Sequence, residues 1–470
     1  MSNQDCEIGL VGLGVMGGNL ALNMADHGFP VALYNRTAEK TRQFMAKEKG
    51  VRPLAAAYTL KEFVGLLRPP RAIILLVAAG PAVDGVIEAL LPFLDPGDLV
   101  IDGGNSHFRD TARRSQSLTD AGLLFMGLGI SGGERGARFG PSLMPGGSLE
   151  GYERVRPVLE AVAAKVNGEP CVAYLGPGAA GHYVKMVHNG IEYAVQQLIA
   201  ETYDLLKVGL ELNNDALHEI FAKWNQEELQ SYLMEITSHI FSRLDEKTGR
   251  HLVDLILDVA RQKGTGIWTS QEALDLQVPA PTLNLAVAMR GLSELKEERE
   301  TASRALPGPA VRFTGDTRLF ADKIKNALYA GIIVVYAQGM ALLRRASRAY
   351  HLHLDLETVA HIWRGGCIIR AALLQDIRAA YQKQPHLPNL LLDPHLGREI
   401  LNRQADWREV LQSAVEWAIP TPALSASLCY FDAYRRARLP ANLIQAQRDY
   451  FGAHTYERLD MPGSFHTEWE

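Results

Sequence analysis

Short apolar runs alternate with helical patterns over the first third of the chain. The spacing predicts helices over Met16–His27, Ala38–Glu48, Pro81–Phe93 and Arg109–Ala121, with a further helix from about Tyr152. The runs that predict strands are Glu7–Val11, Val31–Tyr34, Ala72–Val77, Leu99–Asp102 and Leu123–Gly127, and a last strand is expected near Cys171–Tyr174. Strand–helix alternation of this kind predicts a mostly parallel sheet with helices on both faces.

The pattern changes after Gly176-Pro177-Gly178. From Ala179 to about Arg438, strand signals nearly vanish and long helical patterns dominate. The final segment, Leu439–Glu470, is polar, aromatic and irregular, and its aromatic side chains favour docking over fraying. The chain is therefore expected to comprise an α/β part (1–178), a large all-helical part (179–438) and an extended C-terminal tail (439–470).

A polar stripe interrupts an apolar helix at Lys185, His188, Asn189 and Glu192. The spacing i, i+3, i+4 and i+7 places all four within an arc of about 100°. A helix that is apolar over the rest of its circumference is normally buried. Burying an amine and a carboxylate costs several kcal/mol per ion unless they are paired or functional.

Two interpretations of this stripe remain open, a structural ion pair and a proton-handling pair. Two helical turns separate Lys185 from Glu192 by roughly 10 Å of rise, which favours a substrate between them over direct contact. We therefore expect Lys185 and Glu192 to be catalytic, with His188 and Asn189 orienting a substrate.

Gly12-Leu13-Gly14-Val15-Met16-Gly17 follows the first strand and opens a helix, the context of a dinucleotide-binding fingerprint. It predicts that the sheet is of the Rossmann type and that a pyrophosphate lies at the helix N-terminus. The second strand ends in Asn35-Arg36-Thr37 rather than in an acidic residue. Arg36 can face a 2′-phosphate, with Asn35 and Thr37 as neutral donors, so NADP is preferred over NAD.

Two further loops follow strands of the predicted sheet, at the edge where open α/β sheets bind ligands. They are Val77-Ala78-Ala79-Gly80 and Asp102-Gly103-Gly104-Asn105-Ser106. Asn105 could bridge nicotinamide and substrate. Ordinary turn chemistry explains a Gly-Gly-Asn sequence equally well.

Two segments carry the chemistry of anion binding. Ser131-Gly132-Gly133 offers consecutive backbone amides, which suit a carboxylate. Lys263-Gly264-Thr265-Gly266 combines a cation, a hydroxyl and flexible backbone, which suit a phosphate, although its spacing is not that of a Walker loop. By pattern alone, Arg290, Arg448 and His454 are surface or salt-bridge residues.

Composition describes an ordinary soluble protein of two or three domains: 470 residues, 47% hydrophobic and 21% charged. A net charge of −5 argues against nucleic acid as a partner. The four cysteines lack metal-ligand spacing, so no metal is expected and the thiols are expected to be reduced. The first residues lack a signal core, and the longest apolar stretch, Tyr329–Leu343, is too short for a bilayer. We expect a cytoplasmic protein without a membrane partner.

Several long motifs, in order, resemble the NADP-dependent, decarboxylating 6-phosphogluconate dehydrogenases. Beyond the stripe and the loops already named, they include Ile-Ser-Gly-Gly-Glu at 130–134 and Trp-Arg-Gly-Gly-Cys-Ile-Ile-Arg at 363–370. They close with Leu-Pro-Ala-Asn-Leu-Ile-Gln-Ala-Gln-Arg-Asp-Tyr-Phe-Gly-Ala-His at 439–454. The resemblance covers nearly the whole chain.

The resemblance implies an enzyme that converts 6-phosphogluconate to ribulose 5-phosphate and CO2 while reducing NADP, in the oxidative branch of the pentose phosphate pathway. Lys185 matches the general base and Glu192 the acid that protonates the product. Cofactor contacts are implied for Gly12, Leu13, Gly14, Val15, Met16, Gly17, Asn35, Arg36, Thr37, Val77, Ala78, Ala79 and Asn105. Substrate contacts are implied for Asn105, Ser131, Gly132, Gly133, His188, Asn189, Tyr193, Lys263, Thr265, Arg290, Arg448 and His454.

In this family Arg448 and His454 come from the tail of the partner subunit, which implies a homodimer with shared sites. A base that works near neutral pH needs a lowered pKa, which burial and a nearby Lys263 would give Lys185. The chain departs from the family at Ala78 and Ile267, where lysines are common. Losing each exposed charge could weaken ligand binding by around 1 kcal/mol.

Two other functions are compatible with parts of the pattern. A β-hydroxyacid dehydrogenase or an imine-reducing enzyme shares the glycine fingerprint and the catalytic lysine, but such chains are shorter and lack the Lys263–Gly266 motif and the Arg448/His454 tail. A non-catalytic NADP-binding regulatory protein would not need to keep both Lys185 and Glu192.

Overall fold

The computed structural model describes the chain except for residues 1–5, 49, 263, 310–312 and 470. A seven-stranded sheet in the order β3-β2-β1-β4-β5-β6-β7 forms its N-terminal part. The strands are β1 (Ile8–Val11), β2 (Val31–Tyr34), β3 (Leu54–Ala57), β4 (Ala72–Leu75), β5 (Leu99–Asp102), β6 (Leu124–Ser131) and β7 (Ser142–Gly147). All neighbours are parallel except β6 and β7, which are antiparallel. This order confirms the predicted Rossmann-type fold.

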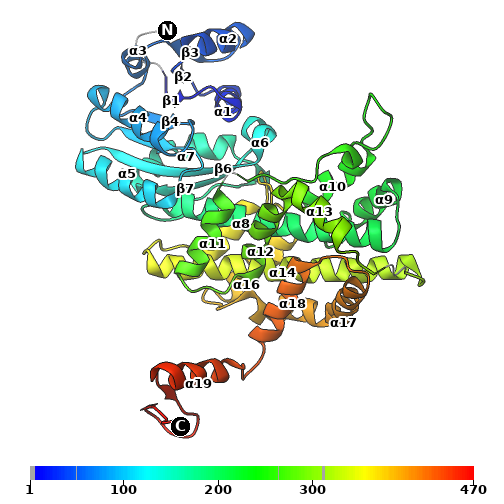
Figure 1. The fold of residues 1–470 in the computed structure, drawn as a ribbon. Helices are drawn as coiled ribbons and strands as arrows, with labels where there is room; N and C mark the ends of the chain where they lie inside the picture. Colours follow the sequence, from blue (N-terminus) through cyan, green and yellow to red (C-terminus); the bar gives the residue numbers. More distant parts are fainter. Residues whose placement is uncertain (1–5, 49, 263, 310–312, 470) are drawn as a thin grey trace.

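Helices cover both faces of this sheet (Figure 1). They are α1 (Val15–Asp26), α2 (Ala38–Glu48), α3 (Leu60–Gly65), α4 (Pro81–Leu90), α5 (Phe108–Asp120), α6 (Gly133–Phe139) and α7 (Leu149–Val162). Successive strand residues point to opposite faces, so Leu10 packs in one core with Leu20 and Tyr152, whereas Val11 packs in another with Phe63. Burial on both faces explains why these strands are continuous apolar runs.

Three expectations about strands need correction. Leu54–Ala57 was not predicted because its alanine-rich sequence has little strand preference. The glycine-rich tract after residue 131 contains β7, and β6 continues to Ser131, because antiparallel pairing fixes this tract despite its glycines. The strand expected near Cys171–Tyr174 is absent: only Val172 pairs, in a single bridge to Leu143.

The second part is helical, as predicted. Its helices are α8 (Ala180–Asp204), α9 (Asn214–Trp224), α10 (Tyr232–Ser242), α11 (Thr265–Asp275), α12 (Pro281–Glu294), α13 (Lys296–Ala305), α14 (Thr317–Ala349), α15 (Leu356–Trp363), α16 (Leu373–Lys383), α17 (Pro394–Glu416) and α18 (Pro422–Tyr434). Among the described residues, α14 is long and apolar enough to cross a membrane, judged by length and composition alone. However, 89% of its apolar window is buried, which is typical of a core helix.

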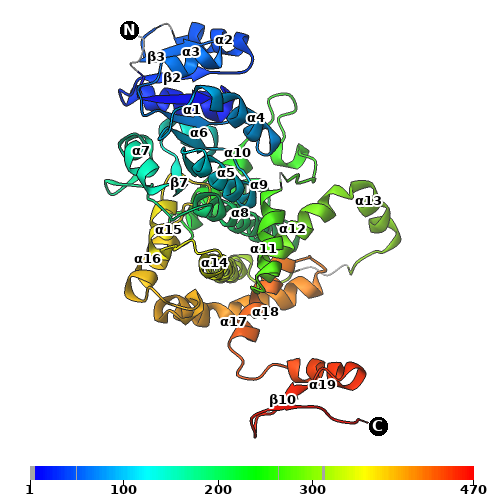
Figure 2. The same cartoon turned by 90° about the vertical axis from the view of Figure 1, so that its left-hand side faces the viewer.

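Helix α8 joins the two parts. It contacts β6 and β7 and then runs along α11, α12 and α14 (Figures 1 and 2). Two glycines permit the close contact with the sheet. A Cβ atom on Gly181 would lie 2.4 Å from the Gly127 carbonyl oxygen, and one on Gly129 would lie 2.6 Å from Cβ of Lys185. The stripe on α8 is thereby held against the end of β6.

The tail stands away from the rest of the chain in both views (Figures 1 and 2). It contains α19 (Ala441–Gly452) and a hairpin of β10 (Tyr456–Glu457) and β11 (Ser464–Phe465). The buried carboxylate of Asp449 accepts hydrogen bonds from the backbone amides of Thr455 and Thr467 and from the indole of Trp469. The tail thus has a small polar centre of its own.

Candidate active site

The glycine loop between β1 and α1 leaves room for a ligand beside a helix N-terminus. Gly12 has φ +105°, and a Cβ atom there would lie 2.3 Å from the Leu76 carbonyl oxygen. A Cβ atom on Gly14 would meet nothing within 4 Å. Helix α1 has neither a side-chain cap nor an acidic residue in its first turn, so its amides are available to an anion. These features fit the pyrophosphate of a dinucleotide.

The end of β2 is tied to the same loop. The Leu13 amide donates to Oδ1 of Asn35 over 3.1 Å, and Nδ2 of Asn35 donates to the Thr37 carbonyl over 3.2 Å. Asn35 therefore holds the loop in shape. Arg36 and Thr37 are exposed beside it, and within the described chain the Arg36 guanidinium has no hydrogen bond or ion pair. An exposed, uncommitted guanidinium at this position fits a 2′-phosphate.

A cavity of about 300 Å³ lies between the glycine loop and the loops that follow β4 and β5. It is lined by Gly14, Val15, Met16, Gly17, Leu76, Val77, Gly103, Gly104, Asn105 and Ile130. Ala78 and Ala79 are exposed next to it. Its position at the carboxyl ends of the strands is where this sheet type binds ligands. The predicted cofactor residues Val77 and Asn105 therefore share one cavity with the fingerprint.

Lys185, His188 and Asn189 of the stripe on α8 are buried, as predicted, and Glu192 is half-buried. Lys185 is 7% exposed, and its Nζ atom donates to Oδ1 of Asn189 over 2.7 Å. His188 lies between the helix and β6: its Nδ1 is 3.0 Å from Oδ1 of Asn189 and its Nε2 is 3.2 Å from Oγ of Ser131. Nζ of Lys185 lies 3.5 Å from the same Nδ1, so the amine, the imidazole and the Asn189 amide form one hydrogen-bonded group.

The acid of the stripe has different partners. A carboxylate oxygen of Glu192 accepts from Nε2 of Gln196 over 3.4 Å, and the other lies 4.0 Å from Nδ1 of His188. Neither contact involves Lys185, so the described residues show no ion pair between the two charged members of the stripe. The structural-pair interpretation is therefore not supported.

Burial sets the electrostatics of these groups. It lowers the pKa of Lys185, and the attraction of Glu192 opposes this only in part. It raises the pKa of Glu192, against the opposing effects of Lys185 and Arg290. Burial and the neighbouring Lys185 hold the pKa of His188 well below its usual value. All three shifts favour neutral forms, which suits an amine acting as base and a carboxylic acid acting as proton donor.

The backbone turn after β6 lies beside the stripe. Gly132 has φ +120°, and a Cβ atom there would lie 2.3 Å from the carbonyl oxygen of Gly366. Gly133 has φ +61° with nothing near its Cβ position. The turn needs glycine and leaves space over Gly133, as the predicted anion site requires.

Tyr193 and Arg290 continue the stripe toward α11 and α12. The Arg290 guanidinium stacks on the Tyr193 ring at 3.7 Å, and it also contacts Oε1 of Gln196. Gly266 lies under the same ring, since a Cβ atom there would be 2.4 Å from the ring. Thr265 is buried at the start of α11. Lys263, predicted to bind phosphate and to lower the pKa of Lys185, lies outside the described residues.

Family models match both parts of the chain. One described as "6-phosphogluconate dehydrogenase, C-terminal domain" matches residues 181–469, and one described as "NAD binding domain of 6-phosphogluconate dehydrogenase" matches residues 7–176. The chain belongs to the 6-phosphogluconate dehydrogenase family. The resemblance noted from the motifs is thereby confirmed.

Named relatives match this family member over nearly their whole length. "6-Phosphogluconate dehydrogenase, decarboxylating" of Synechococcus elongatus is 56% identical, covering 98% of this chain and 99% of the relative. "6-Phosphogluconate dehydrogenase, NADP(+)-dependent, decarboxylating" of Bacillus subtilis is 53% identical, covering 100% of both. A solved structure of the Plasmodium falciparum 6-phosphogluconate dehydrogenase superposes with a TM-score of 0.96 at 44% identity, covering 99% of this chain and 100% of that one.

Two residues predicted from the family motifs do not join the site within one chain. Arg448 is exposed on α19 and donates to Oε1 of Gln445, and His454 is exposed beside the Phe451 ring. Both belong to the tail that stands apart from α8 (Figures 1 and 2). Their predicted role in a partner's site is compatible with this position.

Sequence reasoning missed some residues that support the site of this family member. Gln196 bridges Glu192 to Arg290, and the Trp363 ring packs edge-on against His188 at 5.7 Å. Gln196 continues the i+4 spacing from Glu192, so the helical pattern contained a signal for it. Trp363 is distant in sequence, and its signal was its place in the family motif at 363–370.

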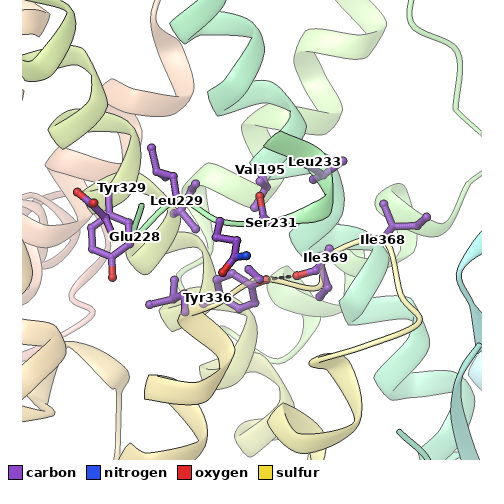
Figure 3. A pocket seen from close by; sticks show the side chains of 13 residues that line it. Val195, Glu228, Leu229, Ser231, Leu233, Tyr329, Tyr336, Ile368 and Ile369 are labelled. Carbon is purple, nitrogen blue, oxygen red and sulfur yellow. Dashed lines mark hydrogen bonds between the residues drawn. The ribbon is translucent and has the colours of Figure 1, made fainter. Parts of the chain in front are cut away.

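A second, small cavity lies farther along α8, beyond Glu192 (Figure 3). Its volume is about 20 Å³, and its lining includes Val195, Tyr336 and Ile369. The Tyr336 hydroxyl donates to the Ile369 carbonyl over 2.8 Å, so the polar group at its edge is already satisfied. A volume of this size holds about one water molecule, which excludes it as a sugar-acid site.

Proposed function

We propose that this chain catalyses the NADP-dependent oxidative decarboxylation of 6-phosphogluconate to ribulose 5-phosphate and CO2. The observation that carries the proposal is the buried stripe of α8, in which Lys185 and Glu192 have separate neutral partners and oppositely shifted pKa values. An amine and an acid that are both held toward their neutral forms can accept one proton and donate another in a single turnover.

The residues around the glycine loop fit the cofactor. The free N-terminus of α1 would hold the pyrophosphate, exposed Arg36 with Thr37 the 2′-phosphate, and the cavity lined by Val77 and Asn105 the nicotinamide end. When bound, NADP supplies the hydride acceptor. The chain's own contribution is to shape this cavity and to place it next to the stripe at the end of β6.

Lys185 would act as the general base. Its unprotonated Nζ takes the proton from the C3 hydroxyl as the hydride leaves C3. The resulting 3-keto acid loses CO2 because the new carbonyl accepts the electrons of the C1–C2 bond. Lys185, now protonated, polarises that carbonyl and stabilises the enediol. Asn189 holds Nζ in place, and His188 with Ser131 orients hydroxyl groups of the sugar acid.

Glu192 would act as the general acid. Burial raises its pKa and so favours the protonated carboxyl group, the form that can protonate C1 of the enediol. Gly132 and Gly133 would receive the substrate carboxylate. Tyr193, Thr265, Arg290 and Lys263 would bind toward the phosphate.

The tail completes the site in this proposal. Arg448 and His454 would reach the phosphate of a substrate bound to a second copy of the chain, making a homodimer with shared sites. The aromatic and aliphatic side chains that α19 exposes, Leu443, Ile444, Tyr450 and Phe451, support docking on another surface. Residues 1–178 would then form the NADP-binding domain, 179–438 the substrate and dimerisation domain, and 439–470 the docking tail. The substrate class supports a cytoplasmic enzyme of the pentose phosphate pathway.

One assay tests the function. Purified protein is mixed with 6-phosphogluconate and NADP, and NADPH and CO2 are followed together. Equal amounts of both products are expected, and they should vanish in the Lys185→Met variant. NADPH without CO2 would instead support a β-hydroxyacid dehydrogenase. Neither product would support a regulatory NADP-binding protein. Both alternatives are disfavoured by decarboxylating relatives that are 53% and 56% identical over nearly the whole chain.

A further inference from the structure

A single buried guanidinium connects the two loops that line the cofactor cavity. Arg114 lies on α5, and its side chain is 2% exposed. Its Nε and Nη2 atoms donate to the two carboxylate oxygens of Asp84 over 2.8 and 2.9 Å, and Nη2 also donates to the Gly80 carbonyl over 3.0 Å. These contacts hold the loop after β4 at its end, because Gly80 directly follows Val77, Ala78 and Ala79 and Asp84 lies in the first turn of α4.

The other edge of the same guanidinium fixes the loop after β5. Nη1 of Arg114 donates to Oδ2 of Asp102 over 3.2 Å and to Oγ of Ser106 over 3.3 Å. Asp102, whose side chain is fully buried, accepts in turn from the Gly104 amide at 3.0 Å and from the Ser106 hydroxyl at 2.6 Å. Gly104 and Asn105 line the cavity opposite Val77. The side chain of Arg114 therefore holds both of the loops that line this cavity.

We propose that Arg114 is a positioning residue, which sets where the nicotinamide end of the cofactor lies relative to Lys185. The inference rests on the proposed function. Arg114 touches neither the cavity nor the stripe, so it acts through the two loops. A planar fork of donors can hold two carboxylates and a carbonyl at fixed angles, which a lysine ammonium cannot do. Without the fork the loops relax apart, and a small displacement at a hydride-transfer site is costly.

The neighbouring Arg113 provides a matched control. Its guanidinium donates over 2.9 Å to Oδ1 of Asp84, the oxygen that also accepts from Nε of Arg114. However, the Arg113 side chain is 58% exposed and has no contact with Asp102. Arg113→Gln therefore removes a charge and an Asp84 contact without releasing the loop after β5. Arg114→Lys keeps the charge of Arg114 and loses the fork. Ser106→Ala removes the 2.6 Å bond to Asp102 while leaving the buried ion pair in place.

Two measurements on each variant test the proposal: the NADPH dissociation constant, from a fluorescence titration without sugar acid, and the deuterium isotope effect on kcat with substrate labelled at C3. For Arg114→Lys we expect NADPH binding weaker by about tenfold and a larger isotope effect, because hydride transfer becomes slower relative to other steps. The KM for 6-phosphogluconate should change little. Ser106→Ala should shift both quantities in the same direction by less, and Arg113→Gln should match the wild type.

A purely structural role would give a different result. Partial unfolding lowers kcat by lowering the amount of active enzyme, and it leaves the isotope effect and the NADPH dissociation constant of the folded fraction unchanged. That outcome, or an Arg114→Lys variant identical to Arg113→Gln, would overturn the proposal. If Arg114→Lys does not fold, Ser106→Ala decides by the same two readouts. A wild-type protein that binds NADPH and produces neither NADPH nor CO2 from 6-phosphogluconate would refute the proposed function instead.

Discussion

The Nζ atom of Lys185 donates to Oδ1 of Asn189, 2.7 Å away on the next turn of α8, and not to Glu192. Glu192 accepts from Gln196 and is separated from the amine by His188. Each charged member of the stripe thus has a neutral amide as its hydrogen-bond partner. Burial can then lower the pKa of the amine and raise that of the acid, since no contact ion pair stabilises their charged forms.

Replacing Asn189 with Asp should reverse the shift at Lys185. A carboxylate in place of Oδ1 favours the protonated amine, so the pKa of Lys185 rises. Because the base must be unprotonated, the acid limb of the kcat/KM profile for 6-phosphogluconate should move to higher pH by about one unit or more. Gln196→Glu adds the same charge two turns farther along α8 and should move the limb less. An Asn189→Asp profile with its acid limb in the wild-type position would contradict the assignment of Lys185 as base.

Arg36 should control the choice between NADP and NAD. Its guanidinium is exposed, and within the described chain it has no protein partner to lose. Arg36→Ser is expected to weaken NADP binding by roughly 10- to 100-fold, leaving NAD binding and the melting temperature unchanged. Arg42→Ser is the control, because Arg42 is paired with Glu39 at 3.6 Å and stacked on Tyr58. Equal loss for both dinucleotides would mean that Arg36 contacts a group common to NADP and NAD.

The parts predicted from the sequence are those in which neighbours along the chain determine the structure. The spacing of Lys185, His188, Asn189 and Glu192 on one helix predicted their shared face and the burial of all but Glu192, which is half-buried. The strand–glycine–helix order of residues 8–26 predicted the dinucleotide loop. In both cases the residues that cooperate lie within a few turns of each other, so periodicity carries the information.

The parts that escaped prediction depend on contacts between distant segments. Arg114 is unremarkable in an amphipathic helix, and only the fold brings Asp84 and Asp102 to its two edges. The strand β7 contains Pro145, Gly146 and Gly147, which disfavour strands, and pairing with β6 overrides that preference. Arg448 and His454 were assigned to the site from family motifs alone, since nothing in their local pattern distinguishes them.

Glu201 should make stability depend on pH. It is 3% exposed on α8, and its carboxylate accepts from the amides of Ala423 and Leu424 in the first turn of α18. Burial raises the pKa of Glu201 from 4.5 to about 7. Between these values the folded protein keeps a proton that the unfolded chain has released, so the free energy of unfolding falls as pH rises through this window. Glu201 accounts for a decrease of roughly 3 kcal/mol in the free energy of unfolding. This decrease is complete once the pH lies above the pKa of Glu201 in the folded protein.

Glu201→Gln cannot ionise and should remove this dependence. Melting temperatures of wild type and variant are compared at two pH values. At about pH 5 the Glu201 carboxyl of the folded wild type is mostly protonated, and at about pH 8 it is mostly ionised. The wild-type melting temperature should fall more than that of the variant. Glu150→Gln, at a side chain that is 73% exposed, serves as the control and should follow the wild type. Parallel curves for wild type and Glu201→Gln would show that Glu201 is already ionised in the folded protein at the lower pH.

Glu272 connects the sheet to the helical part. One of its carboxylate oxygens accepts from Arg109 of α5 over 2.9 Å. The other accepts from the hydroxyl of Tyr350 over 2.9 Å and from that of Tyr183 over 3.4 Å. The carboxylate is buried, and all of its partners are donors. Four elements, α5, α8, α11 and the end of α14, therefore meet at one acceptor.

Glu272→Gln should destabilise the protein, because the amide NH2 group then faces donors and one acceptor oxygen is lost. The cost expected for a buried, charge-assisted network is about 1–3 kcal/mol, seen as a melting temperature lower by several degrees. Asp275→Asn is the control for the same arginine, because Asp275 also contacts Arg109, over 3.1 Å. The Asp275 side chain is 58% exposed, so this variant should lose less than about 0.5 kcal/mol of stability. Equal losses of stability in the two variants would contradict this prediction. They would mean that the buried Glu272 carboxylate contributes no more to the contact between the two parts than the exposed ion pair of Arg109 with Asp275.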